Sequence, residues 1–162
     1  MEDLLLKFFK SVSILKKEER KYFYDLVIEG LIPPGCRAEF WKVCCGSKAY
    51  KSSYCRDYYK TLQRTASREQ DEYPNPMFSK IDKDMNRTFQ EDYFTDEVKA
   101  SIKRVLKSYI WRNPTVGYIQ GMNFLVFRLM KCLQDEEDTF WVFCCIVETY
   151  FTPDFYVDCF GA

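Results

Sequence analysis

Arg87 lies near the end of the stretch SKIDKDMNRTF, residues 79–89, in which the other charges largely cancel, and this setting raises the question of its role. A guanidinium keeps its positive charge and presents a rigid fork of hydrogen-bond donors. Asp84 lies three residues earlier and is expected to hold that group in place. From spacing alone, however, the pattern is more often that of a surface arginine in a local ion pair.

A second side chain, Gln120, has the chemistry to direct a water molecule. It lies in the stretch NPTVGYIQGMN, residues 113–123, where proline and glycine interrupt the chain before Tyr118. Gly121 permits a close approach of the backbone, so we expect Gln120 at the mouth of a helix. An amide there can donate and accept hydrogen bonds. Taken alone, it is more often an amide that satisfies backbone groups at a helix start.

Composition excludes several other classes of site. The 162 residues are 47% hydrophobic, which fits one compact domain or part of a larger one. Twenty-four basic residues balance twenty-four acidic ones, so we expect no nucleic-acid partner and no direct membrane insertion. The chain has no histidine, which excludes a Cys/His zinc site and a Ser-His-Asp triad. We expect no metal site.

The cysteines and the first residues indicate a cytoplasmic protein. Eight cysteines occur without a C-x-x-C spacing, and we interpret them as buried thiols rather than as a disulfide framework. Residues 1–20 combine acids, lysines and apolar residues in a pattern unlike a secretory leader. No apolar run approaches the length of a membrane span.

Hydrophobic periodicity is helical almost throughout, and the predicted fold class is all-α. We expect helices near residues 18–29, from about residue 37, over 93–111, over 118–133, and after an N-cap at Asp135. The last of these is apolar around most of its circumference and should lie in the middle of a bundle. Residues 68–77 are expected to form an exposed connection. Ser79 and Asp82 form a candidate capping box, with Ile81, Met85 and Thr88 facing inward.

The two stretches together resemble a known family. The pattern Ile-x-x-Asp-x-x-Arg-Thr is matched by Ile81, Asp84, Arg87 and Thr88, and the pattern Tyr-x-Gln-Gly-Met-Asn by Tyr118, Gln120, Gly121, Met122 and Asn123. Both patterns are typical of the TBC-domain family of Rab GTPase-activating proteins. A weaker similarity to the family's first motif involves Ile32, Pro33, Arg37 and Trp41. The resemblance covers about residues 30–162.

The resemblance implies a fold and a mechanism. The fold would be a multi-helix orthogonal bundle, the amino-terminal part of a TBC domain. Arg87 would be an arginine finger and Gln120 a glutamine finger, both supplied in trans to a Rab in its GTP-bound state. Asp84 would orient the arginine, while Tyr118 and Asn123 would hold the loop. Such an activator has no cofactor of its own and acts on GTP and magnesium bound to the partner. It would be cytoplasmic and recruited to endomembranes through the Rab.

The same resemblance predicts how the chain is organised. Residues 1–29 would be a leading helical segment, and residues 30–162 the amino-terminal part of a TBC domain. Leu31 stands where the first motif usually has glycine. The last residues, FTPDFYVDCFGA, resemble a point past the middle of such a domain, so we expect the native chain to continue and the cut to expose an apolar patch. Trp41 is expected in the core, where its loss would be strongly destabilising.

Three alternatives remain open from the sequence. One is a TBC-fold scaffold that binds a Rab without accelerating hydrolysis, which the presence of both fingers argues against. Another is a helical interaction module without a GTPase partner. The last is a thiol enzyme that uses Cys44 and Cys45 or Cys144 and Cys145, which the absence of histidine disfavours. The sequence does not identify the target Rab.

Overall fold

The computed structural model of the chain describes residues 16–72, 75–88, 93–151 and 155, with Arg20, residues 69–72 and Thr88 described by their backbone alone. Within these ranges the chain is helical and contains no strand. A 3-10 turn spans Pro34–Cys36 and a π-helical turn spans Ile146–Tyr150. The α-helices are α2 (Lys17–Ile28), α3 (Arg37–Cys44), α4 (Ser47–Ser52), α5 (Tyr58–Glu72), α6 (Pro76–Thr88), α7 (Asp96–Arg112), α8 (Met122–Leu133) and α9 (Glu136–Cys145).

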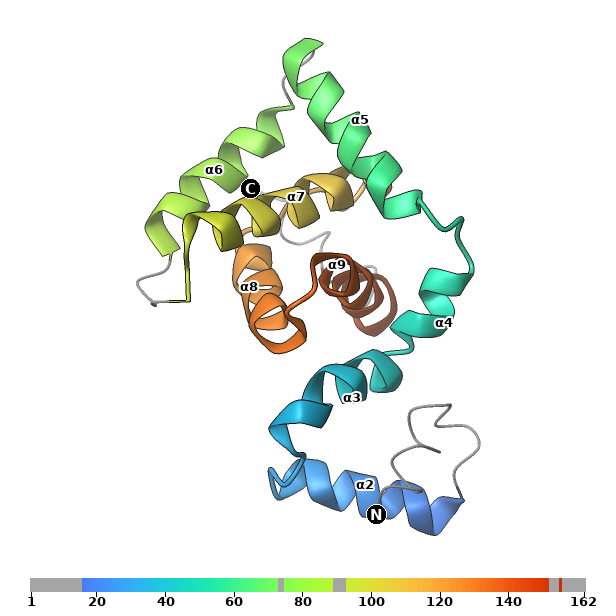
Figure 1. Ribbon diagram of the computed structural model, residues 1–162. Helices are drawn as coiled ribbons and strands as arrows, with labels where there is room; N and C mark the ends of the chain where they lie inside the picture. Colours follow the sequence, from blue (N-terminus) through green and yellow to red (C-terminus); the bar gives the residue numbers. More distant parts are fainter. Residues whose placement is uncertain (1–15, 73–74, 89–92, 152–154, 156–162) are drawn as a thin grey trace.

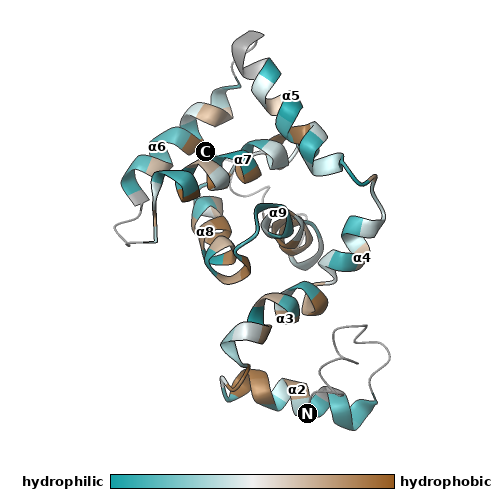
Figure 2. Cartoon of the chain, in the orientation of Figure 1, coloured by the Kyte–Doolittle hydropathy of each residue, from teal (hydrophilic) through white to brown (hydrophobic). Residues whose placement is uncertain are grey.

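Helix α7 is the centre of the bundle and packs against α5, α6, α8 and α9 (Figure 1). Helix α9 lies against α4, α7 and α8, and every residue from Thr139 to Cys145 is buried. This confirms the prediction that an all-round apolar helix takes the middle of the bundle. Hydrophobic residues are concentrated on α8 and at the end of α2, whereas α5 is mostly hydrophilic (Figure 2).

Local signals set most of the helix ends in the core. Thr95 Oγ1 accepts a hydrogen bond from the backbone of Val98 at the start of α7, and Asp135 Oδ1 accepts one from Asp138 at the start of α9. The second of these is the predicted N-cap. Helix α7 ends at Arg112, immediately before Asn113 and Pro114, because the residue before a proline disfavours the α-helical region.

Three predicted boundaries are wrong. Helix α5 continues to Glu72, so the expected connection at residues 68–77 is shorter than predicted. Helix α6 begins at Pro76, which places Ser79 inside the helix rather than in a capping box; Asn75 Oδ1 accepts from the Met77 backbone instead. Helix α8 begins at Met122, not at Tyr118, because a turn with two left-handed glycines precedes it.

One buried ion pair joins segments that are distant in sequence. The Arg112 side chain is only 6% exposed and pairs with Glu148, with Nε 2.9 Å from Oε1. Its Nη2 also donates to the hydroxyls of Tyr50 and Tyr54, at 2.6 and 2.8 Å. The guanidinium lies near the ring of Trp141 as well. Arg112 therefore ties α4 and the π-helical turn to the end of α7.

The expectation of buried thiols is correct only for α9. Cys144 and Cys145 are buried, while Cys44 and Cys55 are exposed and Cys36, Cys45 and Cys132 are intermediate. Cys159 lies outside the described residues. Cys36, Cys45 and Cys55 lie in turns or between α-helices, where helical periodicity does not predict depth.

Candidate functional site

Helix α6 has an apolar face that packs into the core and a polar face on its outer side. Phe78, Ile81 and Met85 are at most 4% exposed and pack into the core. Their spacing of three and four residues is that of one side of a helix. The opposite stripe consists of Lys80, Lys83, Asp84 and Arg87. The predicted inward position of Ile81 is confirmed, and Arg87 points away from the core.

A tight turn presents Gln120 beside α6. Gly117 and Gly121 have φ angles of +61° and +101°, which side chains rarely adopt. At Gly117 a Cβ atom would also lie 2.5 Å from Met77 Sδ, the flexible end of a side chain at the start of α6, so the positive φ is the stronger reason for glycine. Gly121 is the N-cap of α8, and Gln120 directly before it is exposed. The prediction that Gln120 lies at the mouth of a helix is confirmed.

A hydrogen bond joins the two stretches. The Tyr118 hydroxyl donates to Asp84 Oδ2 at 2.8 Å, and Tyr118 is 5% exposed. Burial raises the pKa of Tyr118, and the neighbouring Asp84 carboxylate raises it further, so the hydroxyl stays protonated and keeps donating. Asp84 therefore connects the helix of the arginine to the turn of the glutamine.

Arg87 has no such connection. It makes no hydrogen bond or ion pair with any other residue that the structure describes, and it is exposed. The expected ion pair between Asp84 and Arg87 is thus absent, because Asp84 faces Tyr118 instead. Among the described residues, none occupies a donor of the Arg87 guanidinium.

Arg87 and Gln120 line the same groove, which has a volume of about 830 Å³. One wall is the outer stripe of α6 and the other is the turn with the first residues of α8. The groove is lined by Lys80, Lys83, Asp84, Arg87, Tyr118, Ile119, Gln120, Gly121 and Phe124. Sequence analysis missed the two lysines, Ile119 and Phe124. The helical spacing of Lys80 and Lys83 relative to Arg87 was the signal that could have found the lysines.

Comparison with known proteins gives this groove a context. Residues 34–160 match the Rab-GTPase-TBC domain family. The chain belongs to this family. The match includes Arg87 and Gln120 and extends over all helices from α3 to α9.

Individual TBC proteins agree with this assignment. The chain is 35% identical over 136 residues to mouse TBC1 domain family member 2B, and the match covers 80% of this chain and 14% of that protein. It is 37% identical over 103 residues to human TBC1 domain family member 2A, which is 61% of this chain and 11% of that protein. The match thus spans only about one seventh of the length of the first relative and one ninth of that of the second.

A solved structure has the same fold. The crystal structure of the Chlamydomonas flagellar RabGAP TBC domain superposes with a TM-score of 0.71 at 25% sequence identity. The superposition covers 78% of this chain and 43% of that chain. The predicted fold class, an all-α TBC fold, is confirmed.

The remaining residues of the two central TBC motifs lie near the groove or in the core. Asn123 is 1% exposed in the first turn of α8, which fits the expected role of holding the loop. Thr88 is the last residue of α6, and the position of its side chain lies outside the described residues. Over the ranges that the structure describes, no group of histidine, cysteine or acidic residues is arranged to hold a metal ion. None of the helices described there is long and apolar enough to cross a membrane.

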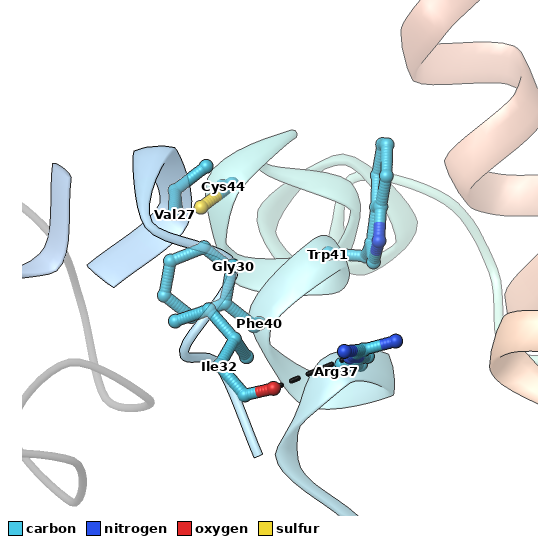
Figure 3. Close-up of a pocket in the computed structure, with 7 residues that line it drawn as sticks. All are labelled: Val27, Gly30, Ile32, Arg37, Phe40, Trp41 and Cys44. Atoms are coloured by element: carbon cyan, nitrogen blue, oxygen red, sulfur yellow. Dashed lines mark hydrogen bonds between the residues drawn. The ribbon is translucent and has the colours of Figure 1, made fainter. Parts of the chain in front are cut away.

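The first TBC motif lies elsewhere, between α2 and α3. Arg37 Nε donates to the carbonyl oxygen of Ile32 at 3.2 Å, which fixes the turn that begins at Pro33 (Figure 3). Ile32 and Phe40 are buried, but Trp41 is 46% exposed and stands apart from them (Figure 3). The prediction that Trp41 belongs to the core is wrong, because nearly half of its side chain is exposed.

The thiol pairs do not form part of the groove. A hydrogen bond with the Cys145 thiol lowers the pKa of Cys45 to about 6, although burial opposes that shift. Burial raises the pKa of Cys44 to about 11 and raises that of Cys144 as well. None of these cysteines lines the cavity of Arg87 and Gln120. The structure therefore brings no described thiol to the site.

Proposed function

We propose that this chain accelerates GTP hydrolysis on a Rab-family GTPase in its GTP-bound state, with Arg87 as an arginine finger and Gln120 as a glutamine finger. The observation that carries the proposal is that both side chains line one groove, on opposite walls. Membership of the Rab-GTPase-TBC domain family supports the partner class.

The chemistry of phosphoryl transfer needs both side chains. Negative charge on the phosphate oxygens must be neutralised, and the attacking water must be held in line. A guanidinium inserted in trans meets the first need through its permanent charge and its fork of donors. An amide meets the second need because it can accept from the water and donate at the same time. GTP and magnesium would be held by the partner, and this chain would bring no cofactor of its own.

In the free protein, the exposure of Arg87 and the fixed position of the turn that carries Gln120 both suit this chemistry. Arg87 is exposed and makes no hydrogen bond or ion pair with the other described residues, so docking would not need to break an existing bond. The hydrogen bond between Tyr118 and Asp84 would keep α6 and the turn at a fixed separation, which lowers the entropic cost of assembling the transition state. We further infer that the protein acts in the cytoplasm on endomembranes that carry the Rab, in vesicle trafficking.

Single-turnover GTP hydrolysis tests the proposal. A panel of purified Rab GTPases is loaded with GTP and mixed with this chain, with the double variant Arg87→Ala/Gln120→Ala, or with Arg56→Lys/Gln134→Asn as a control outside the groove. We expect acceleration of at least one Rab by the wild type and the control, and none by the double variant. Binding without acceleration by the wild type would contradict the proposal and favour a scaffold.

A further inference from the structure

The outer stripe of α6 carries more positive charge than one finger requires. Lys80 and Lys83 lie on the same stripe as Arg87 and are exposed. Neither lysine forms an ion pair or hydrogen bond with another residue in the described part of the chain. The carboxylate of the groove, Asp84, already accepts the Tyr118 hydrogen bond. The chain as a whole has no net charge, so this wall is a local concentration of cations.

Of the two lysines, Lys80 lies about two helical turns from the phosphate expected at Arg87, whereas Lys83 lies one turn away. With a rise of 1.5 Å per residue, Lys83 is about 6 Å and Lys80 about 10 Å from Arg87 along the axis. If a γ-phosphate contacts Arg87, Lys80 would face the surface of the partner protein around the nucleotide. Charges at such a position act on a partner protein rather than on the reacting atoms.

The opposite wall ends in an exposed aromatic ring. Phe124 is 49% exposed on the first turn of α8 and lines the same groove as Gln120. Ile119, the residue before Gln120 in the sequence, is half-buried in the same groove. Large aromatic side chains at the rim of a functional groove are the type of residue that anchors protein interfaces.

We propose that Lys80, Lys83 and Phe124 form a docking surface that selects the GTPase, and that its partner is an acidic segment flanked by an apolar side chain. The proposal rests on the proposed function and adds the chemistry by which the site chooses its substrate. The lysines accelerate encounter with the acidic segment, because complementary rim charges act on the association rate. Phe124 inserts against the apolar side chain and slows dissociation. Arg87 and Gln120 then act only on the hydrolysis step.

Charge reversal separates docking from catalysis. The variant Lys80→Glu/Lys83→Glu is compared with Lys17→Glu/Lys21→Glu, which makes the same change in net charge on α2, at the other end of the molecule from α6 (Figure 1). Association with the panel of Rab GTPases, loaded with a non-hydrolysable GTP analogue, is measured by stopped flow at low and high salt. We expect the α6 variant to associate about tenfold or more slowly at low salt, and the gap to shrink at high salt, because salt screens exposed charges. The α2 variant should behave as the wild type.

Two further measurements complete the test. Phe124→Ala should raise the dissociation rate about tenfold, which corresponds to about 1.4 kcal/mol. At saturating concentrations of this chain, the hydrolysis rate of each docking variant should stay within about twofold of the wild type, since uniform binding does not alter the chemical step.

The outcomes distinguish this inference from the proposed function. Charge-dependent binding without any acceleration of hydrolysis would support the docking surface and contradict the two fingers. Accelerated hydrolysis with equal association rates for the α6 and α2 variants would support the fingers and overturn the docking surface. A loss of saturated hydrolysis rate in Lys80→Glu/Lys83→Glu would also overturn it, because the lysines would then act on the transition state.

Discussion

Arg87 and Arg112 lie in the last turns of α6 and α7, yet they have opposite surroundings. Arg112 is 6% exposed, pairs with Glu148 and donates to two tyrosine hydroxyls. Arg87 is exposed and makes no hydrogen bond or ion pair within the described part of the chain. The carboxyl end of a helix dipole favours a cation at both positions equally. The difference therefore comes from the tertiary partners and not from the local sequence.

The comparison separates an arginine that stabilises the fold from one that is available for a reaction. The donors of Arg112 are used to hold α4, α7 and the π-helical turn together, so it has little capacity left for a ligand. Arg87 contributes little to the fold and keeps its five donors for a partner. Arg104 is intermediate: its side chain is 48% exposed and pairs with Glu136 at 2.6 Å. Substitutions at these three sites should affect hydrolysis and stability in different proportions.

The largest effect is expected on hydrolysis from Arg87→Lys. An arginine finger contributes about 10³–10⁵-fold in rate, or about 4–7 kcal/mol, and lysine should recover little of it because a point charge does not span two phosphate oxygens. The denaturant midpoint should not change, since Arg87 has no described partner to lose. Single-turnover hydrolysis with a responsive Rab and urea unfolding measure the two quantities. A wild-type rate in the variant would return Arg87 to the class of surface arginines.

The next largest effect is expected on stability from Arg112→Met. The substitution leaves Glu148, whose side chain is only 16% exposed, without its cation, and breaking a largely buried ion pair in this way costs up to about 3–5 kcal/mol. The double variant Arg112→Met/Glu148→Leu removes both charges and should be more stable than Arg112→Met alone. Urea unfolding of both variants checks this. Equal loss in the two variants would show that the aromatic contacts of Arg112, rather than its charge, hold this region.

The ion pair between Arg104 and Glu136 should make the stability of the protein depend on pH. Burial alone would raise the pKa of Glu136, but hydrogen bonds from Arg104 and Tyr59 outweigh it and lower the pKa below its ordinary value of 4.5. Because the pKa is lower in the folded state, the contribution of Glu136 is complete above its unfolded pKa and is lost as the pH falls through the folded value.

Stability should therefore decline on acidification below about pH 4.5. Glu136→Gln should be less stable than the wild type at pH 7, and the two should converge at low pH. The measurement is urea unfolding of both proteins between pH 7 and pH 3. Parallel curves across that range would show that the Arg104 contact does not stabilise the folded protein.

Local patterns predicted some parts of the molecule and not others. The central helices α7 and α9 and the N-cap at Asp135 followed from periodicity and capping, which depend on neighbouring residues only. The surroundings of Arg112 did not, because Tyr50 and Tyr54 lie about 60 residues earlier and no local pattern relates them to α7. The role of Asp84 was also missed in part, since its partner Tyr118 is 34 residues away.

The candidate site was predictable because two short motifs contain its main residues. Spacing placed Arg87 on the outer face of α6 and Gln120 at a helix mouth, but each alone favoured an ordinary structural role. Their common groove depends on the approach of the turn to α6, which the hydrogen bond from Tyr118 to Asp84 joins across 34 residues of sequence. The lysines were missed because the motif does not specify their positions, and Phe124 because it follows the second motif.

The smallest effect is expected from Trp41→Ala, in contrast to Trp141→Ala. Trp41 is 46% exposed on α3, whereas Trp141 is 2% exposed in α9. Trp141→Ala should lower the free energy of unfolding by about 3–5 kcal/mol. The variant loses the transfer free energy of a large buried ring and also leaves a cavity in the core. Trp41→Ala should cost about 1 kcal/mol or less, as for substitutions near the surface. Urea unfolding of the two variants compares them directly, and an equal loss at Trp41 would show that its ring is enclosed in solution.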